Sequence, residues 1–323
     1  YKRQEHNDSI IFIVDLRPPV FTYVYPNNGT YTNVSLITLK FSAYDNFGIE
    51  YYVVVVDYGE QKIINMSEYN ISLGEGEHTI CIKAVDIAGN VVSVVIILFA
   101  DFTPPEISIL TPASMILGLA EINVTWSVDD NFGVDHCEVR LDNYSWVDVG
   151  VATSYVFEGV SEGTHRVCVR AYDRAGNRIE EVMIVIIDLT SPRIVIEYPT
   201  NSSYINSSIV VVLFSVYDVT LNRIEVRIDG GYWIIIDVQA NNVTVELADG
   251  EHIVEIKAID RVGRGSVVFV RFIVDTVAPS ITGINYYVDD RNIYIIWSVD
   301  DLSLIHISEP TRPRLISYAV FCL

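Results

Sequence analysis

Aspartate recurs in this sequence at a nearly constant interval, which makes its carboxylates the first candidates for chemistry. An aspartate that follows an apolar run and precedes a proline-bearing linker occurs at intervals of 86, 87 and 87 residues: Asp15, Asp101, Asp188 and Asp275. Carboxylates gathered in one place repel each other unless a hard cation neutralises them, and Ca²⁺ takes about six to eight oxygen ligands. The alternative is that each aspartate caps its own turn through local hydrogen bonds.

Two further motifs repeat with the same period and carry more acids. One is an aromatic-Ser pair followed by acids, beginning at Phe41, Trp126, Phe214 and Trp297. The other reads Ala-x-Asp-x-x-Gly and begins at Ala84, Ala171 and Ala258. A fixed period of this kind is typical of tandem repeats, in which each repeat is one structural unit.

The elements that would position these residues are β-strands. Apolar and polar residues alternate within each repeat: Ile122, Val124 and Trp126 point one way, and Asn123 and Thr125 point the other. No segment of useful length has helical periodicity, and Gly, Asn, Asp and Pro punctuate the strands at short intervals. The predicted fold class is therefore all-β, a tandem array of Ig-like antiparallel β-sandwiches with about seven strands each.

The period also sets the predicted domains. Whole repeats are expected at residues 15–100, 101–187 and 188–274, with residues 1–14 as the last strand of a preceding repeat and 275–301 as the start of a fourth. The native protein is then longer at both ends. Proline in the short linkers predicts stiff joints and a rod-like array in which each repeat contacts only its neighbours.

In an Ig-like sandwich, the loop after the second strand and the last hairpin both lie at the N-terminal end, beside the linker. The repeated aspartates should therefore converge at three joints. The predicted metal ligands are Asp15, Asp45 and Asp86 at the first joint, Asp101, Asp129, Asp130 and Asp173 at the second, and Asp188, Asp218 and Asp260 at the third.

The C-terminal segment 302–323 has a different origin. Leu302–Arg312 and Ile316–Leu323 resemble, in order and in frame, the translation of a sequencing-library adapter, with the sample index between them. We expect this segment to be an artefact that is not native, so that the chain is a fragment of an assembled metagenome-type sequence.

The motifs also carry a family resemblance. The sequence motifs at Asp101–Pro105, Asp249–His252 and Ala171–Asn177 resemble those of the Ig-like repeats of prokaryotic, especially archaeal, cell-surface and adhesin-type proteins. The resemblance covers nearly all of residues 1–301 and implies a non-catalytic module, with Ca²⁺ stiffening the joints. The third repeat departs from the pattern, because Arg261–Arg264 replaces the Ala-Gly-Asn turn.

Asparagine forms more N-glycosylation sequons than chance provides. Ten of the 19 Asn residues in 1–301 begin Asn-x-Ser/Thr, where chance predicts about two. The sequon asparagines are Asn7, Asn28, Asn33, Asn65, Asn70, Asn123, Asn143, Asn201, Asn206 and Asn242. This excess predicts an exported glycoprotein, whereas the alternative is coincidence among turn-forming residues.

Repeated aromatic and histidine residues have structural and functional interpretations. Trp146 and Trp233 follow turns and are candidates to stack on sugars, or else pack across their own sheets. His78, His165 and His252 recur singly, which favours a residue at a strand start over a zinc ligand.

The cysteines predict no disulfide within a repeat. Cys137 is expected to face inward as a small core residue, and Cys168 outward on another strand. Cys81 is the equivalent of Cys168 one repeat earlier, so both are expected to be free or to bridge to another chain.

The composition and charge of the chain disfavour several classes of function. The 323 residues carry a net charge of -21, with 21 basic against 42 acidic residues, which disfavours binding to nucleic acid or anionic lipid. No apolar run reaches the length of a membrane helix. No nucleophile or phosphate-binding motif occurs, and no enzyme activity and no cofactor other than Ca²⁺ are predicted.

The sequence thus predicts an extracellular structural stalk of an S-layer-like envelope or of an adhesion protein. Its expected partners are the neighbouring repeats and cell-surface proteins or glycans. The alternative is that the repeats are spacers or carbohydrate-binding modules of a secreted hydrolase.

Overall fold

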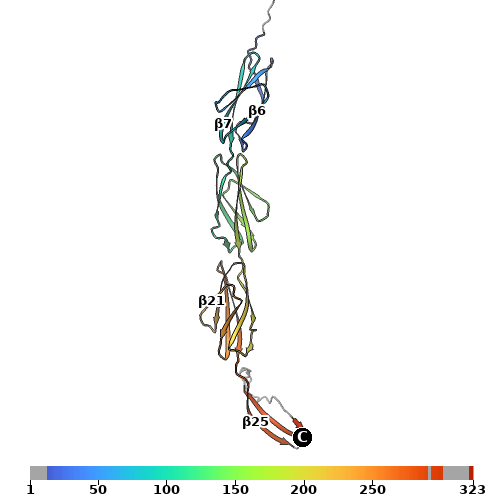
Figure 1. Cartoon of the computed structure of the whole chain (residues 1–323), viewed down its shortest axis with the longest axis vertical. Coiled ribbons are helices and arrows are strands. Elements are labelled where there is room, and N and C mark those ends of the chain that lie inside the picture. The colour runs from blue at the N-terminus through green and yellow to red at the C-terminus, as the bar shows by residue number, and fades with distance from the viewer. Residues whose placement is uncertain (1–12, 290–291, 301–319, 323) are drawn as a thin grey trace, which may run out of the picture. The chain divides into compact units, whose positions relative to one another are not determined.

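A computed structural model describes residues 13–289, 292–300 and 320–322. Among these residues all regular elements are β-strands, which confirms the predicted all-β class (Figure 1). No helix long and apolar enough to cross a bilayer occurs in this part of the chain. The chain divides into two compact units: the first comprises residues 1–115, 121–160 and 164–185, and the second comprises 116–120, 161–163 and 186–323.

The strands up to β24 fall into three sets of eight. The first repeat, coloured blue to cyan in Figure 1, has β1 (Val20–Tyr25), β2 (Thr30–Thr32), β3 (Leu36–Tyr44), β4 (Ile49–Val56), β5 (Lys62–Ile64), β6 (Glu68–Ser72), β7 (Gly76–Asp86) and β8 (Val91–Ala100). The second repeat has β9 (Glu106–Thr111), β10 (Ile116–Leu117), β11 (Glu121–Asp129), β12 (Val134–Leu141), β13 (Val147–Gly150), β14 (Ser154–Glu158), β15 (Gly163–Asp173) and β16 (Arg178–Ile187). The third repeat has β17 (Arg193–Tyr198), β18 (Ser203–Ile205), β19 (Ile209–Tyr217), β20 (Leu221–Ile228), β21 (Ile234–Ile236), β22 (Asn242–Glu246), β23 (Gly250–Asp260) and β24 (Gly265–Val274).

Each repeat pairs its strands into a three-stranded and a five-stranded sheet. The three-stranded sheets have the orders β1-β3-β6, β14-β11-β9 and β17-β19-β22. The five-stranded sheets have the orders β2-β8-β7-β4-β5, β10-β16-β15-β12-β13 and β18-β24-β23-β20-β21. The repeats are therefore Ig-like sandwiches with the same topology.

The number of strands is eight rather than about seven because the chain changes sheets near the start of each repeat. In the first repeat β1 pairs antiparallel with β3, and β2 then pairs parallel with β8 in the other sheet. The X-Pro peptide between these strands is cis at the equivalent point of each repeat: Tyr25-Pro26, Thr111-Pro112 and Tyr198-Pro199. The crossing divides one expected strand into two short ones.

A further sheet follows the third repeat. It contains β25 (Ser280–Asp289), β26 (Asn292–Asp300) and β27 (Val320–Cys322). The adapter-like segment 302–323 lies outside the described residues except for β27, which pairs with the start of β26.

The core of each sandwich is apolar and is built around one aromatic side chain. Phe41, Trp126 and Phe214, the first residues of the aromatic-Ser motif, are at most 2% exposed. Burying one such side chain stabilises the folded state by about 1.5–3 kcal/mol. Cys137 is fully buried, which confirms its predicted place in the core.

A histidine-aspartate contact joins the turn after β4 to the start of β7 in the first repeat, and its equivalents occur in the other two repeats. In the first repeat His78 Nδ1 lies 2.6 Å from Asp57 Oδ2, and His78 Nε2 lies 3.0 Å from the Gly74 carbonyl. Asp57 has a φ of 50° at the turn, and its other oxygen accepts the Thr79 N–H. His165 with Asp142 and His252 with Asp229 repeat the contact, each at 2.8 Å.

Both ring nitrogens of His78 and of His252 lie beside hydrogen-bond acceptors. Only a protonated imidazole can donate to both acceptors at once. Burial lowers the pKa of these two imidazoles, but the hydrogen bonds to the aspartate and the carbonyl outweigh it, and the net pKa is raised. A raised pKa in the folded state means that the contribution to stability is complete below the unfolded value of about 6.5. It is lost as the pH rises through the folded pKa.

We therefore predict that Asp57→Asn lowers the pKa of His78. The asparagine can keep the φ and the bond from Thr79 but no longer provides an anionic acceptor. The measurement is an NMR titration of the imidazole signals in the full chain. The control is Glu77→Gln, which removes a charge next to His78 without removing a bond. A wild-type His78 that titrates at or below about 6.5 contradicts the prediction.

Candidate metal centres

Three groups of aspartates meet at the N-terminal ends of the three repeats. Within each group, one carboxylate oxygen from each residue lies within 4.8 Å of the others. The first triad is Asp15, Asp45 and Asp86, the second is Asp101, Asp130 and Asp173, and the third is Asp188, Asp218 and Asp260. Every triad takes one residue from the linker, one from the loop after the second long strand, and one from the last hairpin.

In each triad, one carboxylate oxygen of the loop aspartate is used to form its own turn. Asp130 Oδ1 accepts the N–H groups of Phe132 and Gly133 at 2.9 and 2.8 Å. Asp45 accepts the Phe47 N–H, and Asp218 the Thr220 N–H, in the same way. The local capping weighed from the sequence is thus real, but it occupies only one oxygen of each carboxylate.

Other carboxylate oxygens in the triads are buried and accept no hydrogen bond from the described residues. They are Asp15 Oδ2, Asp101 Oδ2, Asp130 Oδ2, Asp188 Oδ1, Asp218 Oδ2 and Asp260 Oδ2. Asp101 and Asp188 are fully buried as whole residues, and Asp260 is 1% exposed. A buried carboxylate without a partner is costly, and a cation that shares these oxygens would remove that cost.

The electrostatics of the second and third triads agree with this shortage of positive partners. Burial is the largest cause that raises the pKa of Asp101, and the neighbouring carboxylates of Asp130, Asp173 and Glu75 raise it further. Burial likewise raises the pKa of Asp218, with its triad partners adding to the effect.

In the first two repeats, the asparagine that follows the Ala-x-Asp-x-x-Gly motif hydrogen-bonds the last hairpin to the linker. Asn177 Nδ2 donates to Asp173 Oδ2 and to the Asp101 carbonyl, at 2.7 and 2.8 Å. Asn90 makes the corresponding bonds to Asp86 and to the Asp15 carbonyl. The asparagine therefore satisfies the hairpin carboxylate and holds the linker.

In the third repeat, a longer side chain makes the contact with the linker. Arg264 replaces the asparagine, and its guanidinium donates to the carbonyls of Asp188 and Gly118 at 2.6 Å each. It therefore leaves Asp260 Oδ2 without a bond. The departure noted in the sequence therefore keeps the hold on the linker but loses the side-chain bond to the hairpin carboxylate.

Each of the second and third triads also has an acid that sequence reasoning missed, and the same position recurs one repeat later at Asp249. Glu75 Oε1 accepts bonds from Thr103 Oγ1 and Asn131 Nδ2, at 2.6 and 3.0 Å. Glu162 does the same for Leu189 N–H and Thr190 Oγ1, and Asp249 for Thr276. These acids lie 87 residues apart, just before a Gly-x-His motif, so their period was the signal that could have found them.

Aromatic side chains pack beside the second triad within the first compact unit. Tyr31 and Phe99 of the first repeat stack at 4.7 Å between ring centroids, and Phe132 of the second repeat lies 5.9 Å from Phe99. The Arg174 guanidinium lies over Tyr31 and donates to its hydroxyl at 3.2 Å. The first two repeats are thus in direct contact around the candidate centre.

Asp129 does not belong to the second triad, although the sequence predicts that it does. It is the last residue of β11, is exposed, and pairs with Glu106 across the sheet. It lines a cavity of about 360 Å³ instead. Adjacent residues of an extended strand point to opposite sides, so Asp129 and Asp130 cannot both face the linker.

The two candidate sugar-binding tryptophans are half-buried under cations. The guanidinium carbons of Arg140 and Arg170 lie 4.4 and 3.9 Å from the centroid of Trp146. Trp233 has Arg227 at 4.6 Å and Lys257 at 5.4 Å. Sugar binding would have to compete with these cation-π contacts, so the geometry favours packing of each ring on its own sheet.

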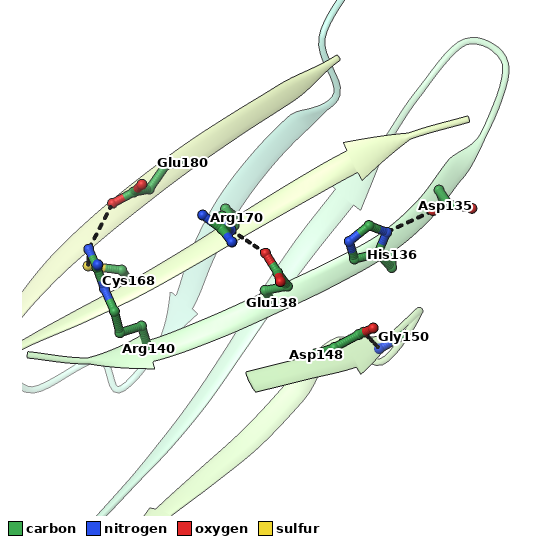
Figure 2. Close-up of polar contacts among 9 residues, drawn as sticks. All are labelled: Asp135, His136, Glu138, Arg140, Asp148, Gly150, Cys168, Arg170 and Glu180. Carbon is green, nitrogen blue, oxygen red and sulfur yellow. Dashed lines mark hydrogen bonds and ion pairs between the residues drawn. The ribbon is translucent and has the colours of Figure 1, made fainter. Parts of the chain in front are cut away.

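Cys168 faces outward from the core, as predicted, but side chains on that face cover it. Figure 2 shows Arg140 extending over Cys168 towards Glu180, while Arg170 and Glu138 point at each other across β12 and β15. Cys168 faces this layer and is fully buried, so it is not available to bridge to another chain. Cys81 is partly exposed, and it, Cys137 and Cys168 have free thiols.

The sequon asparagines of the described chain are all exposed. Asn28, Asn33, Asn65, Asn143, Asn201 and Asn206 lie in loops, and Asn70, Asn123 and Asn242 lie in strands. Asn7 lies outside the described residues. Exposure of every described sequon meets the first requirement for glycosylation.

No protein-family model and no curated protein sequence matches the chain. Among solved structures, the fibronectin(III)-like modules of CbhA from Clostridium thermocellum align at 19% identity over 52% of this chain and 94% of theirs, with a TM-score of 0.30. A tetra-tandem repeat from the extending region of a large adhesion protein aligns at 16% identity over 87% and 81%, with a TM-score of 0.37. SGBP-B of the Bacteroides ovatus mixed-linkage glucan utilization locus, in complex with a heptasaccharide, aligns at 12% over 85% and 74%, with a TM-score of 0.22. At these identities and TM-scores the likenesses carry no argument about the ligands or partners of this chain.

Proposed function

We propose that this chain is part of a non-catalytic stalk on a cell surface, made of Ig-like repeats that are stiffened at their joints by calcium. The observation that carries the proposal is the recurrence of three aspartate triads, each with at least one buried carboxylate oxygen that accepts no hydrogen bond from the described residues. A site for one reaction would not recur in every repeat, whereas a joint must recur wherever two repeats meet.

The geometry of the triads suits Ca²⁺. Ligand oxygens lie about 2.3–2.6 Å from the ion, so two ligands of one ion are separated by at most about 5 Å. The oxygens of each triad lie within 4.8 Å of one another. Three carboxylates at one point favour a hard divalent cation, and backbone carbonyls and water can complete the coordination.

The position of the ligands connects ion binding to stiffness. In the second triad, Asp101 comes from the linker, while Asp130 and Asp173 come from a loop and a hairpin of the second repeat. An ion held by all three would fix the linker to the second repeat. Glu75 of the first repeat already contacts the linker and the same loop, so the preceding repeat would be held against this centre.

The surface of the chain supports an extracellular location. The net charge of -21 keeps the array soluble and suits a calcium-rich exterior, and the sequons are exposed. The binding partner at the cell surface is a protein or a glycan, and the repeats serve to hold it at a distance from the anchor.

We predict that Ca²⁺ raises the thermal unfolding midpoint of the full chain. A ligand that binds only the folded state stabilises it by about 2.7 kcal/mol at a concentration of 100 times its Kd. Calorimetry in increasing Ca²⁺ and in chelator measures the shift. Asp173→Ala should remove the part of the shift that belongs to the second joint.

The matched control for this experiment is Asp129→Ala, which removes an adjacent acid that lies outside the triad. It should leave the calcium shift unchanged. A midpoint that does not respond to Ca²⁺ would mean that proline and side-chain packing alone stiffen the joints, and it would refute the calcium centres.

We also predict that Asp101→Asn has opposite effects with and without the ion. In chelator the substitution should raise the midpoint by a few degrees, because it removes one of several buried like charges. In saturating Ca²⁺ it should lower the midpoint, because a charged ligand is lost. The comparison is made by calorimetry on the full chain, and a substitution that lowers the midpoint equally in both conditions would contradict the prediction.

A further inference from the structure

The outer face of the three-stranded sheet in the third repeat carries an exposed apolar row. Tyr198 of β17 pairs with Leu213 of β19, which pairs with Asn242 of β22. Tyr198 is 43% exposed and Leu213 is 40% exposed, and Ile209 and Val211 continue the apolar surface along β19. These side chains point away from the core, since Val210, Val212 and Phe214 between them are buried.

This row reaches a free edge of the sheet. β22 is the last strand in the order β17-β19-β22, so only one of its sides is paired within the sheet. An apolar surface that continues to an unpaired strand edge is a typical site of self-association. An extracellular repeat therefore needs something that covers this face.

A sequon asparagine lies on the row itself. Asn242 is exposed and lies directly across from Leu213, a separation at which side chains are in contact. Its Nδ2 group donates to Asn241 Oδ1 at 2.8 Å, and a glycosylated amide keeps one N–H for this bond. Its hydrogen-bonding therefore does not prevent attachment of a sugar.

The other two repeats carry a sequon on the same face of the same sheet. Asn123 lies three residues before the core aromatic Trp126, and Thr38 lies three residues before Phe41. Asn70 pairs with Thr38, and its Oδ1 accepts the Thr38 hydroxyl at 2.8 Å, so that this bond does not use Nδ2. The first and second repeats thus place a sequon at neighbouring points of one face from different strands.

We propose that the outer faces of the three-stranded sheets are N-glycosylated at Asn70, Asn123 and Asn242, and that in the third repeat the sugar covers the apolar row and blocks the β22 edge. The occupant is a covalent glycan and not a protein partner. This inference rests on the proposed extracellular location, and it does not depend on the calcium centres.

The chemistry is a transfer of a glycosyl group from a lipid-linked sugar diphosphate, catalysed by an oligosaccharyltransferase of the host. The C1–O bond to the diphosphate breaks, and a C1–N bond to the asparagine Nδ2 forms. The displaced diphosphate leaves with its lipid, and the amide loses one proton. The amide carbonyl is retained, so the Thr38–Asn70 bond persists in the product.

The test uses the full chain secreted from a host that glycosylates Asn-x-Ser/Thr. Peptide mass spectrometry reports the occupancy of each sequon, and sedimentation and binding of a hydrophobic dye report exposure and self-association. Thr244→Ala abolishes the sequon of Asn242 while keeping the asparagine. The control, Ser145→Ala, abolishes the loop sequon of Asn143 instead.

We expect glycans at the three strand asparagines. Thr244→Ala should increase dye binding at least about twofold and cause self-association, whereas Ser145→Ala should not. Adding Leu213→Lys to Thr244→Ala should restore the monomer, because a charge on the row opposes pairing.

Three results would overturn the inference. One is an unoccupied Asn242 in protein whose loop sequons carry glycans, and another is an occupied Asn242 whose loss changes neither readout. The third is the absence of glycans from every sequon. A calcium-dependent midpoint measured on the same material would then show that the proposed stalk survives the failure of this inference.

Discussion

The arrangement of the repeats depends on how buried carboxylates at their N-terminal ends are compensated. Asp101 and Asp188 are fully buried, and each meets two further aspartates within a few ångströms. Such a concentration of negative charge opposes folding unless hydrogen bonds or a cation balance it. The linker, the loop and the last hairpin of each repeat converge at this one point, so its compensation decides how firmly they are held together.

Protein groups supply part of the compensation. Backbone N–H groups satisfy one oxygen of the turn-forming aspartates, and Asn90 and Asn177 satisfy the hairpin carboxylates. Arg264 brings a positive charge to the third triad but uses its donors on backbone carbonyls. The remaining oxygens have no protein donor among the described residues, and they are the basis of the proposed calcium centres.

Away from the joints, the outer faces of the two sheets differ in how their side chains are satisfied. On the outer face of the five-stranded sheet, ion pairs such as Arg227 with Glu255 lie beneath a tryptophan, so the polar groups there are satisfied within the repeat. On the outer face of the three-stranded sheet of the third repeat, apolar side chains remain exposed beside a sequon. One face is thus completed by contacts within the protein, and the other is the face for which we propose a covering glycan.

The sequence by itself determined the all-β class, the period and most members of the triads. Alternation of period two and spacing of 87 residues are local or periodic properties, which can be read without coordinates. The His-Asp contact could not be read in this way, because in the first repeat it depends on the register between β4 and β7, which are far apart in the chain.

Only the tertiary structure decided which oxygen of each aspartate is free. It excluded Asp129, because one step along a strand reverses the direction of a side chain. It buried Cys168 beneath Arg140, and it brought Glu75 of the preceding repeat to the second joint. Periodicity shows which residues are equivalent, but burial and hydrogen bonding depend on which segments distant in the chain pack together.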